Sequence, residues 1–208
     1  MFPELTDLED VLPRFARGEM ALLLDDPERE GEADLIQAAQ FATGESLNFM
    51  IRQARGLVTV AIAAQRLEEL EIPLLERHHA PPHAPRFAAP VDYTPAVTTG
   101  VSAYDRAATI RALLEPQARP EDFARPGHVF PLAARGGGPT QRAGHTEGAV
   151  GLTELAGLYP AAVMCELMDE AGRMAHGAAV QAFSHRHGIP LISVAQVAEA
   201  LGRRKGLA

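Results

Sequence analysis

Residues 20–39 read MALLLDDPEREGEADLIQAA, and this stretch decides the expected fold. Its first apolar run, 20–24, predicts a buried strand, and a second apolar run follows at 35–39. Between them lies an acidic segment, 25–34, that holds six carboxylates in ten residues. We therefore expect a densely charged loop between two apolar elements.

Helix and strand signals alternate along the rest of the chain. Capping residues and apolar periodicity predict helices at 7–17 (with a capping box of Thr6 and Glu9), 43–55, 64–70, 102–114, 146–157, 178–187 and 193–201. Apolar runs predict strands at 57–62, 129–133, 161–167 and 190–192. The proline-rich residues 76–96 predict an irregular excursion with a short strand at 87–92. The alternation indicates an α/β or mixed α+β class, in a single layered domain spanning 1–208.

The charge balance and the cysteine count limit the class of protein. A formal net charge of −8 argues against nucleic acid as a partner, because phosphate backbones need dense Lys and Arg. No apolar run approaches the ~20 residues of a membrane span. The single cysteine, Cys165, favours a reducing compartment, and the acidic N-terminus is unlike a signal peptide. These features predict a cytoplasmic protein that does not bind membranes.

The acidic segment is the first candidate for chemistry. If the segment is extended, alternate side chains share one face, which would gather Glu28, Glu30, Glu32 and Asp34. Four carboxylates on one face repel each other unless they are solvated or a cation lies among them. Hard oxygen ligands suit Mg²⁺ or Mn²⁺. An exposed acidic turn without a metal is the alternative.

A second candidate, Arg142-Ala143-Gly144-His145-Thr146-Glu147, lies at the predicted start of a helix. Free N–H groups and the helix dipole favour an anion there, and Arg142 adds a planar donor for phosphate. His145 offers a neutral ring nitrogen to a metal. A simple capped helix with an exposed histidine is the alternative.

Two further residues are candidates for acid–base chemistry. His128, in the segment RPGHVFPL at 125–132, is expected just before a strand, where a loop residue reaches a cleft. Glu166 is expected inside an apolar strand, where a carboxylate needs a partner or a raised pKa. A structural loop histidine and a solvent-facing strand end are the alternatives. Cys165 is interpreted as a small core residue.

Four ordered motifs carry a resemblance to a known family. They are DDxxRExExD at 25–34, VTTGVSAxDR at 97–106, RPGHVFPL at 125–132 and RxGHTE at 142–147. Together they resemble 3,4-dihydroxy-2-butanone 4-phosphate synthase of riboflavin biosynthesis over nearly the whole chain. The resemblance implies a three-layer α-β-α sandwich with a mixed sheet, and a homodimer with its sites near the interface. It also implies Mg²⁺-dependent conversion of ribulose 5-phosphate into 3,4-dihydroxy-2-butanone 4-phosphate and formate.

The resemblance also implies roles for single residues. Glu30 and His145 match the metal ligands, with Mg²⁺ or Mn²⁺ as the ion and two ions expected per site. His128 and Glu166 match residues needed for catalysis. Residues that match substrate contacts are Arg29, Glu30, Asp34, Arg142, Ala143, Gly144, His145, Thr146 and Glu166. For the first proton abstraction, next to the substrate ketone, our hypothesis gives the base to Glu32 or Asp34.

Some positions depart from the family pattern. The segment 76–90, with His78 and His79, replaces a Thr-rich stretch, and His176 replaces a common arginine. These departures keep a second interpretation open, a catalytically silent homologue that binds a sugar phosphate and metal as a regulatory or scaffolding protein. A different metal-dependent sugar-phosphate lyase or isomerase is a third interpretation. We expect no second domain of the cyclohydrolase kind that some relatives carry.

Overall fold

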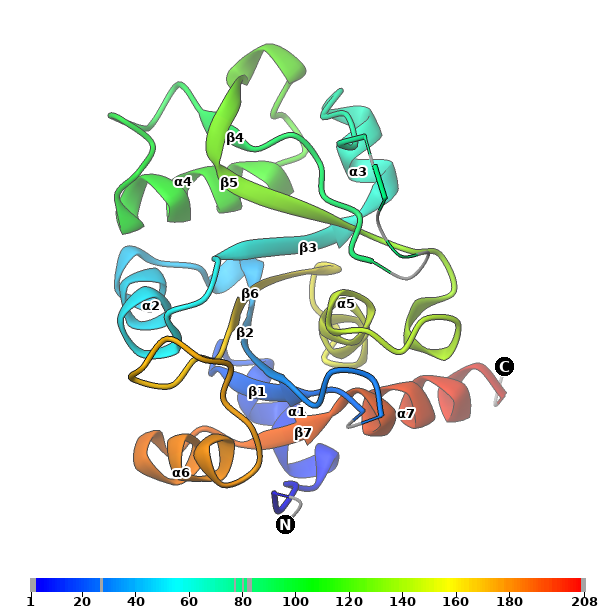
Figure 1. Ribbon diagram of the computed structural model, residues 1–208. Helices are drawn as coiled ribbons and strands as arrows, with labels where there is room; N and C mark the ends of the chain where they lie inside the picture. The colour runs from blue at the N-terminus through cyan, green and yellow to red at the C-terminus, as the bar shows by residue number, and fades with distance from the viewer. Residues whose placement is uncertain (1–2, 27, 77, 80, 82–83, 207–208) are drawn as a thin grey trace.

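The fold is built on a seven-stranded mixed sheet with helices on both faces (Figure 1). The structure is a computed structural model, and it describes residues 3–26, 28–76, 78–79, 81 and 84–206. The strand order is β4-β5-β3-β6-β2-β1-β7. The pairs β1–β7 and β3–β5 are parallel, and the remaining neighbours are antiparallel. The mixed sheet and the α-β-α layering confirm the predicted fold class.

The elements follow the predicted alternation closely. The strands are β1 (Ala21–Leu24), β2 (Ala33–Ala38), β3 (Thr59–Ala63), β4 (Val91–Tyr93), β5 (Phe123–Ala134), β6 (Ala161–Glu166) and β7 (Leu191–Ser193). The α-helices are α1 (Leu8–Phe15), α2 (Gly44–Phe49), α3 (Ala64–Glu69), α4 (Ala103–Leu114), α5 (His145–Leu155), α6 (Ala178–His187) and α7 (Val194–Gly206). A π-helical turn, Met50–Ala54, continues α2.

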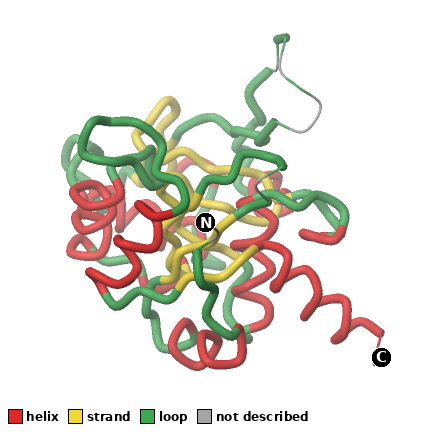
Figure 2. Tube along the Cα trace, turned by 60° about the horizontal axis from the view of Figure 1, so that its bottom comes forward, coloured by secondary structure: helices red, strands yellow, loops and turns green. Residues whose placement is uncertain are grey.

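Two apolar cores lie on opposite faces of the sheet, because successive strand side chains point to opposite sides. One core joins the sheet to α2, α3, α4 and α6, and the other joins it to α1, α5 and α7. In β6, Val163 and Cys165 belong to the first core, whereas Ala162 and Met164 belong to the second. Figure 2 shows the strands between helices on either side, with α7 extending away from the body. Cys165 is fully buried, as expected for a core residue.

Helix starts test the capping predictions. Ser102 accepts a hydrogen bond from the Asp105 backbone N–H, and Thr43 and Ser46 form a reciprocal capping box, so both predicted caps are confirmed. The capping box of Thr6 and Glu9 is wrong. Asp7 caps α1 instead, and the Thr6 hydroxyl accepts a bond from the Leu191 backbone N–H, which ties the N-terminal segment to β7.

The strand β5 begins earlier than the sequence predicts. It starts at Phe123, because β4 pairs with its first residues, so His128 lies within the strand and not in a loop before it. The pairing is interrupted: Val91 is opposite Val129, but Asp92 is opposite Ala124. The residues between those two partners therefore form a bulge that includes His128.

The segment 76–96 contains β4 near its end, and the isolated bridge between Phe87 and Leu132 attaches it to β5. Part of it (residues 77, 80, 82 and 83) lies outside the described residues, so the histidine-rich stretch is described only in part. Within the described part of the chain, we find no helix with the length and apolar character needed to cross a membrane.

Candidate functional site

The acidic segment forms a tight turn between β1 and β2. The Asp26 carbonyl accepts N–H groups from Arg29, Glu30 and Gly31 at 2.9, 3.2 and 3.1 Å. Gly31 has φ +64°, a left-handed conformation that suits glycine. The prediction that alternate carboxylates share one extended face is therefore wrong, because the chain turns before Glu32.

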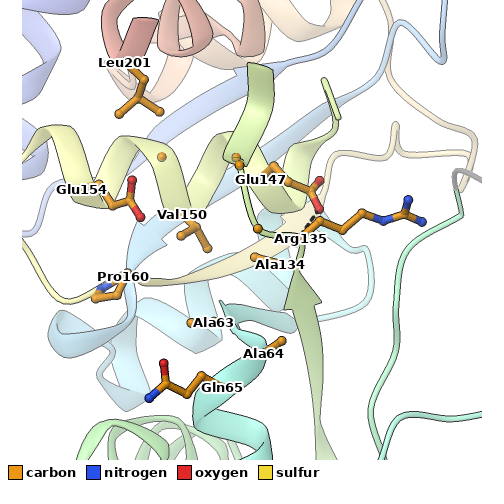
Figure 3. A pocket seen from close by; sticks show the side chains of 14 residues that line it. Ala63, Ala64, Gln65, Ala134, Arg135, Glu147, Val150, Glu154, Pro160 and Leu201 are labelled. Atoms are coloured by element: carbon orange, nitrogen blue, oxygen red, sulfur yellow. Dashed lines mark hydrogen bonds between the residues drawn. The ribbon is translucent and has the colours of Figure 1, made fainter. Parts of the chain in front are cut away.

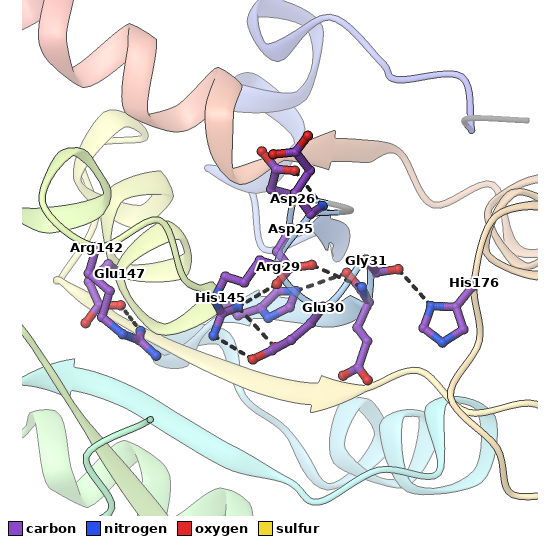
Figure 4. A network of polar contacts seen from close by, with 11 residues as sticks. Asp25, Asp26, Arg29, Glu30, Gly31, Arg142, His145, Glu147 and His176 are labelled. Carbon is purple, nitrogen blue, oxygen red and sulfur yellow. Dashed lines mark hydrogen bonds and ion pairs between the residues drawn. The ribbon is translucent and has the colours of Figure 1, made fainter. Parts of the chain in front are cut away.

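The turn brings two carboxylates toward the start of α5. Asp25, Glu30 and His145 each offer one ligand atom, and these atoms lie within 4.8 Å of one another. The Arg29 guanidinium joins the carboxylates, at 2.5 Å from Asp25 Oδ2 and 2.7 Å from Glu30 Oε1 (Figure 4). The geometry thus gathers the two predicted metal ligands, Glu30 and His145, and adds Asp25.

The donor set fits a small divalent cation. Two carboxylates and one imidazole are ligands that Mg²⁺ and Mn²⁺ accept. His145 is the first residue of α5, and its Nε2 lies 3.2 Å from the Glu32 carbonyl oxygen. The position of the Asp25 carboxylate is fixed by a hydrogen bond, because its Oδ1 accepts the Glu32 backbone N–H at 3.0 Å. These contacts hold the side chains of His145 and Asp25 in place.

Asp34 is a buried carboxylate beside the three candidate ligands. It lies in β2 opposite Glu166, the last residue of β6, and its Oδ1 has no hydrogen-bond partner among the described residues. Burial raises the pKa of Asp34 to about 6, against the effect of His145, and Glu166 and Glu32 raise it further. Burial also raises the pKa of Glu32, and Glu30 adds to this effect. With a pKa of about 6, the Asp34 carboxyl group can exchange a proton near neutral pH.

The helix start of α5 forms the other side of the site. Gly144 is the N-cap residue, so the backbone N–H groups that follow it are free of helical partners. Arg142 lies beside it and forms a buried ion pair with Glu147, whose other oxygen accepts the Arg135 backbone N–H at 3.1 Å. Ala143 and Thr146 complete this turn.

Removing the acid of this buried pair is expected to destabilise the protein. A Glu147→Gln change would remove the carboxylate that pairs with the buried Arg142 guanidinium, which costs about 3 kcal/mol. Glu147 also lines a pocket of about 330 Å³ whose other lining residues are mostly small, with Glu154 as its second carboxylate (Figure 3). Thermal unfolding should show a midpoint lower by roughly 6–12 °C.

The control for this change is Glu121→Gln. Glu121 pairs with Arg119 on the surface, with both side chains more than half exposed. Surface pairs contribute at most about 1 kcal/mol. Equal melting shifts in the two variants would contradict the structural role given to the Arg142–Glu147 pair.

His128 lies apart from the other predicted site residues. The strand β3 separates β5 from β6, and adjacent strands are about 4.8 Å apart, so the backbones that carry His128 and Glu166 are about 10 Å apart. His128 is half-exposed, and its Nδ1 lies 2.7 Å from Asp92 Oδ2. Its side chain therefore contacts the carboxylate of Asp92, which lies 36 residues earlier in the chain.

Three residues of the site were missed from the sequence. Asp25 stands out in the sequence only as part of the acidic motif, and Asp92 lies at the end of the short strand predicted at 87–92. His176, from the loop after β6, has its Nδ1 2.9 Å from the Gly31 carbonyl oxygen and so holds the acidic turn. The capping and periodicity rules carry no signal for such contacts, since the partners of Asp92 and His176 are distant in sequence.

A family model described as 3,4-dihydroxy-2-butanone 4-phosphate synthase matches residues 9–200 of the chain. The 3,4-dihydroxy-2-butanone 4-phosphate synthase of Agrobacterium fabrum is 44% identical over 190 residues, which cover 91% of this chain and 89% of the relative. The riboflavin biosynthesis protein RibBA of Aquifex aeolicus is 42% identical over 202 residues, covering 96% of this chain. The chain spans only 50% of that longer protein.

The solved structures agree with the sequence relatives. A crystal structure of 3,4-dihydroxy-2-butanone 4-phosphate synthase in complex with two magnesium ions superposes with a TM-score of 0.89 at 38% identity. The match covers 97% of this chain and 99% of that one. These relatives support the enzyme over the silent homologue. The chain therefore belongs to the 3,4-dihydroxy-2-butanone 4-phosphate synthase family.

Proposed function

We propose that this chain converts ribulose 5-phosphate into 3,4-dihydroxy-2-butanone 4-phosphate and formate in a Mg²⁺-dependent reaction. The observation that carries the proposal is the group of Asp25, Glu30 and His145, placed beside the buried Asp34 and the start of α5. A cation site, a carboxyl group that titrates near neutral pH and an anion site are the parts that a sugar-phosphate lyase of this kind needs.

Glu30 and His145 would hold the cation, and Asp25 is the third candidate ligand. When bound, a divalent cation supplies positive charge that stabilises the negative charge developing on the ketone and hydroxyl oxygens of the substrate. We propose two ions per site, with Mg²⁺ or Mn²⁺ as the metal. The complex of a relative with two magnesium ions supports this number.

The substrate phosphate would bind at the start of α5. Backbone N–H groups after Gly144, the hydroxyl of Thr146 and the guanidinium of Arg142 are its proposed donors, with Ala143 in the same turn. Glu147 orients Arg142 through their ion pair. Because the chain has a net charge of −8, which repels anions, binding of the phosphate needs the local positive charge of the α5 N-terminus and Arg142.

Asp34 is our preferred base for the first proton, and Glu32 is the second choice. Asp34 is buried and has a raised pKa of about 6, which brings its basic form close to the strength that proton abstraction needs near pH 7. Glu166, opposite Asp34, and His128 are proposed to move protons in the later steps. Arg29 would release the carboxylates of Asp25 and Glu30 and contact the substrate.

Formate release is the direct test of this function. Purified protein with ribulose 5-phosphate and Mg²⁺ should produce formate and a four-carbon phosphate in equal amounts. EDTA should stop the reaction and excess Mg²⁺ should restore it, because the bound cation is proposed to stabilise the negative charge that develops on the ketone oxygen. If the sugar phosphate binds and no formate appears, the silent-homologue interpretation would replace this one.

The assembly and location of the protein are also proposals. We propose a homodimer, supported by the exposed apolar side chains of Leu57, Val101 and Tyr104. Sedimentation would measure the mass of the assembly. The lone cysteine and the acidic composition support a cytoplasmic location, with no nucleic acid or membrane partner.

A further inference from the structure

The bulge in β5 leaves the His128 backbone without its usual strand partner. Since the register between β4 and β5 jumps at Asp92, the His128 N–H cannot bond to a β4 carbonyl in the regular ladder. The Asp92 side chain replaces that partner, and its Oδ1 accepts the His128 N–H at 2.9 Å. The second oxygen, Oδ2, lies 2.7 Å from the His128 ring Nδ1. One carboxylate therefore holds both the backbone and the ring of the same residue.

The surrounding backbone closes over this contact. Gly100 has φ +83°, and a Cβ atom there would lie 2.2 Å from Asp92 Oδ2 and 2.6 Å from His128 Nδ1. The Gly100 N–H in turn donates to Asp105, which fixes the loop that carries it. Asp92 is 8% exposed, whereas the His128 side chain is 46% exposed. The carboxylate and Nδ1 are thus covered, and the rest of the ring faces outward.

An ionised carboxylate only accepts hydrogen bonds, so the ring nitrogen that faces it must carry the proton. In a neutral imidazole the other nitrogen then has a free lone pair. We propose that Asp92 is the positioning residue of His128, holding the ring as the Nδ1–H tautomer so that the outward Nε2 is the atom that moves protons during the reaction. The proton transfer by Nε2 rests on the proposed function, whereas the tautomer of the ring does not.

The Asp92→Asn variant tests the proposal with little change of shape. The asparagine Oδ1 can still accept the His128 N–H, and its amide nitrogen would then face Nδ1 and donate to it. The ring proton should move to Nε2, which removes the free lone pair. We expect kcat for formate release to fall about 10²- to 10⁴-fold. The KM for ribulose 5-phosphate and the affinity for Mn²⁺ should stay within about twofold, because Asp92 touches neither candidate binding group.

Nuclear magnetic resonance reads the tautomer directly. Long-range ¹H–¹⁵N correlation at pH 8.5 should show the Nδ1–H form for His128 in the wild type and the Nε2–H form in Asp92→Asn. The signal is assigned by its loss in His128→Gln. Asp92→Glu keeps a carboxylate and should recover at least tenfold of the activity that Asp92→Asn loses. Asp10→Asn, an exposed aspartate on α1, is the matched control and should change nothing.

The outcomes separate this proposal from the function it serves. An unchanged tautomer in Asp92→Asn, or a kcat within threefold of the wild type, would overturn the role given to Asp92. If the wild type releases no formate, the proposed function fails, and the resonance experiment still decides whether Asp92 sets the tautomer. If Asp92→Asn does not fold, the comparison of the wild type with Asp92→Glu decides: an Nε2–H ring in either protein overturns the proposal.

Discussion

Replacing His145 with alanine is expected to abolish both formate release and tight binding of a divalent cation. The imidazole is one of three groups whose ligand atoms lie within 4.8 Å of one another, and the other two are carboxylates. Without the ring, binding of Mn²⁺ should weaken by at least tenfold to a hundredfold. Formate release should drop below about a thousandth of the wild-type rate, since the cation stabilises the charge that develops on the substrate.

Two comparisons make this result specific. His185→Ala removes a histidine from α6 that contacts Gln181 and lies outside the proposed site, so activity and Mn²⁺ affinity should be unchanged. Glu30→Gln removes the proposed ligand that the acidic turn contributes, and it should weaken Mn²⁺ binding by a similar factor. Titration calorimetry measures the binding. Wild-type affinity in both His145→Ala and Glu30→Gln would place the metal elsewhere.

The Asp34→Asn variant is expected to be inactive and, in metal-free protein, more stable than the wild type. Asp34 is buried, and its Oδ1 has no partner among the described residues, so its ionised form is costly at neutral pH. The amide carries no charge and avoids that cost. Loss of the proposed base should lower kcat about 10²- to 10⁴-fold. Higher stability with lower activity is the expected signature of a site kept under electrostatic strain.

The stability gain should depend on pH with a definite sign. The pKa of Asp34 is raised from an unfolded value near 4 to about 6, so between these values the folded state binds the proton more tightly. The contribution of this carboxyl to the free energy of unfolding therefore falls as pH rises from about 4 to 6, by about 3 kcal/mol in total. Denaturant unfolding in EDTA should show the gain of Asp34→Asn at pH 8 and little gain at pH 4. A larger gain at pH 4 than at pH 8 would contradict the raised pKa.

Apolar patterning predicted most of the sheet because the strands other than β5 are nearly all buried. Residues 21–24 of β1 and 161–165 of β6 are all apolar, because both strands lie between the two apolar cores. A short apolar run is therefore sufficient to predict such a strand. β5 was predicted too short for the opposite reason. Its first residues are largely exposed and pair only with the short edge strand β4, so they lack the apolar run that marks the other strands.

A part of the candidate site could be predicted where one short segment contains both the functional residue and the sequence signal for its local structure. The start of α5 and the acidic loop are of this kind, since capping and charge density are local. The turn at Asp26 could not be predicted. Whether the chain is extended or turned there depends on which backbone N–H groups donate hydrogen bonds to the Asp26 carbonyl oxygen. The contact between Asp92 and His128 joins residues 36 positions apart, and a single sequence contains no signal for it.

Arg29 has a consequence for which ions the acidic turn can accept. Its guanidinium already serves Asp25 and Glu30 as an internal counter-ion, so the turn does not repel itself. An entering ion must displace this resident charge. A monovalent ion brings no more charge than the arginine and gains little from the exchange, whereas a divalent ion gains the difference. The Arg29 guanidinium thus favours divalent over monovalent ions at the acidic turn. A K⁺ ion competes with a guanidinium of equal charge, which the chain keeps at a very high local concentration beside Asp25 and Glu30.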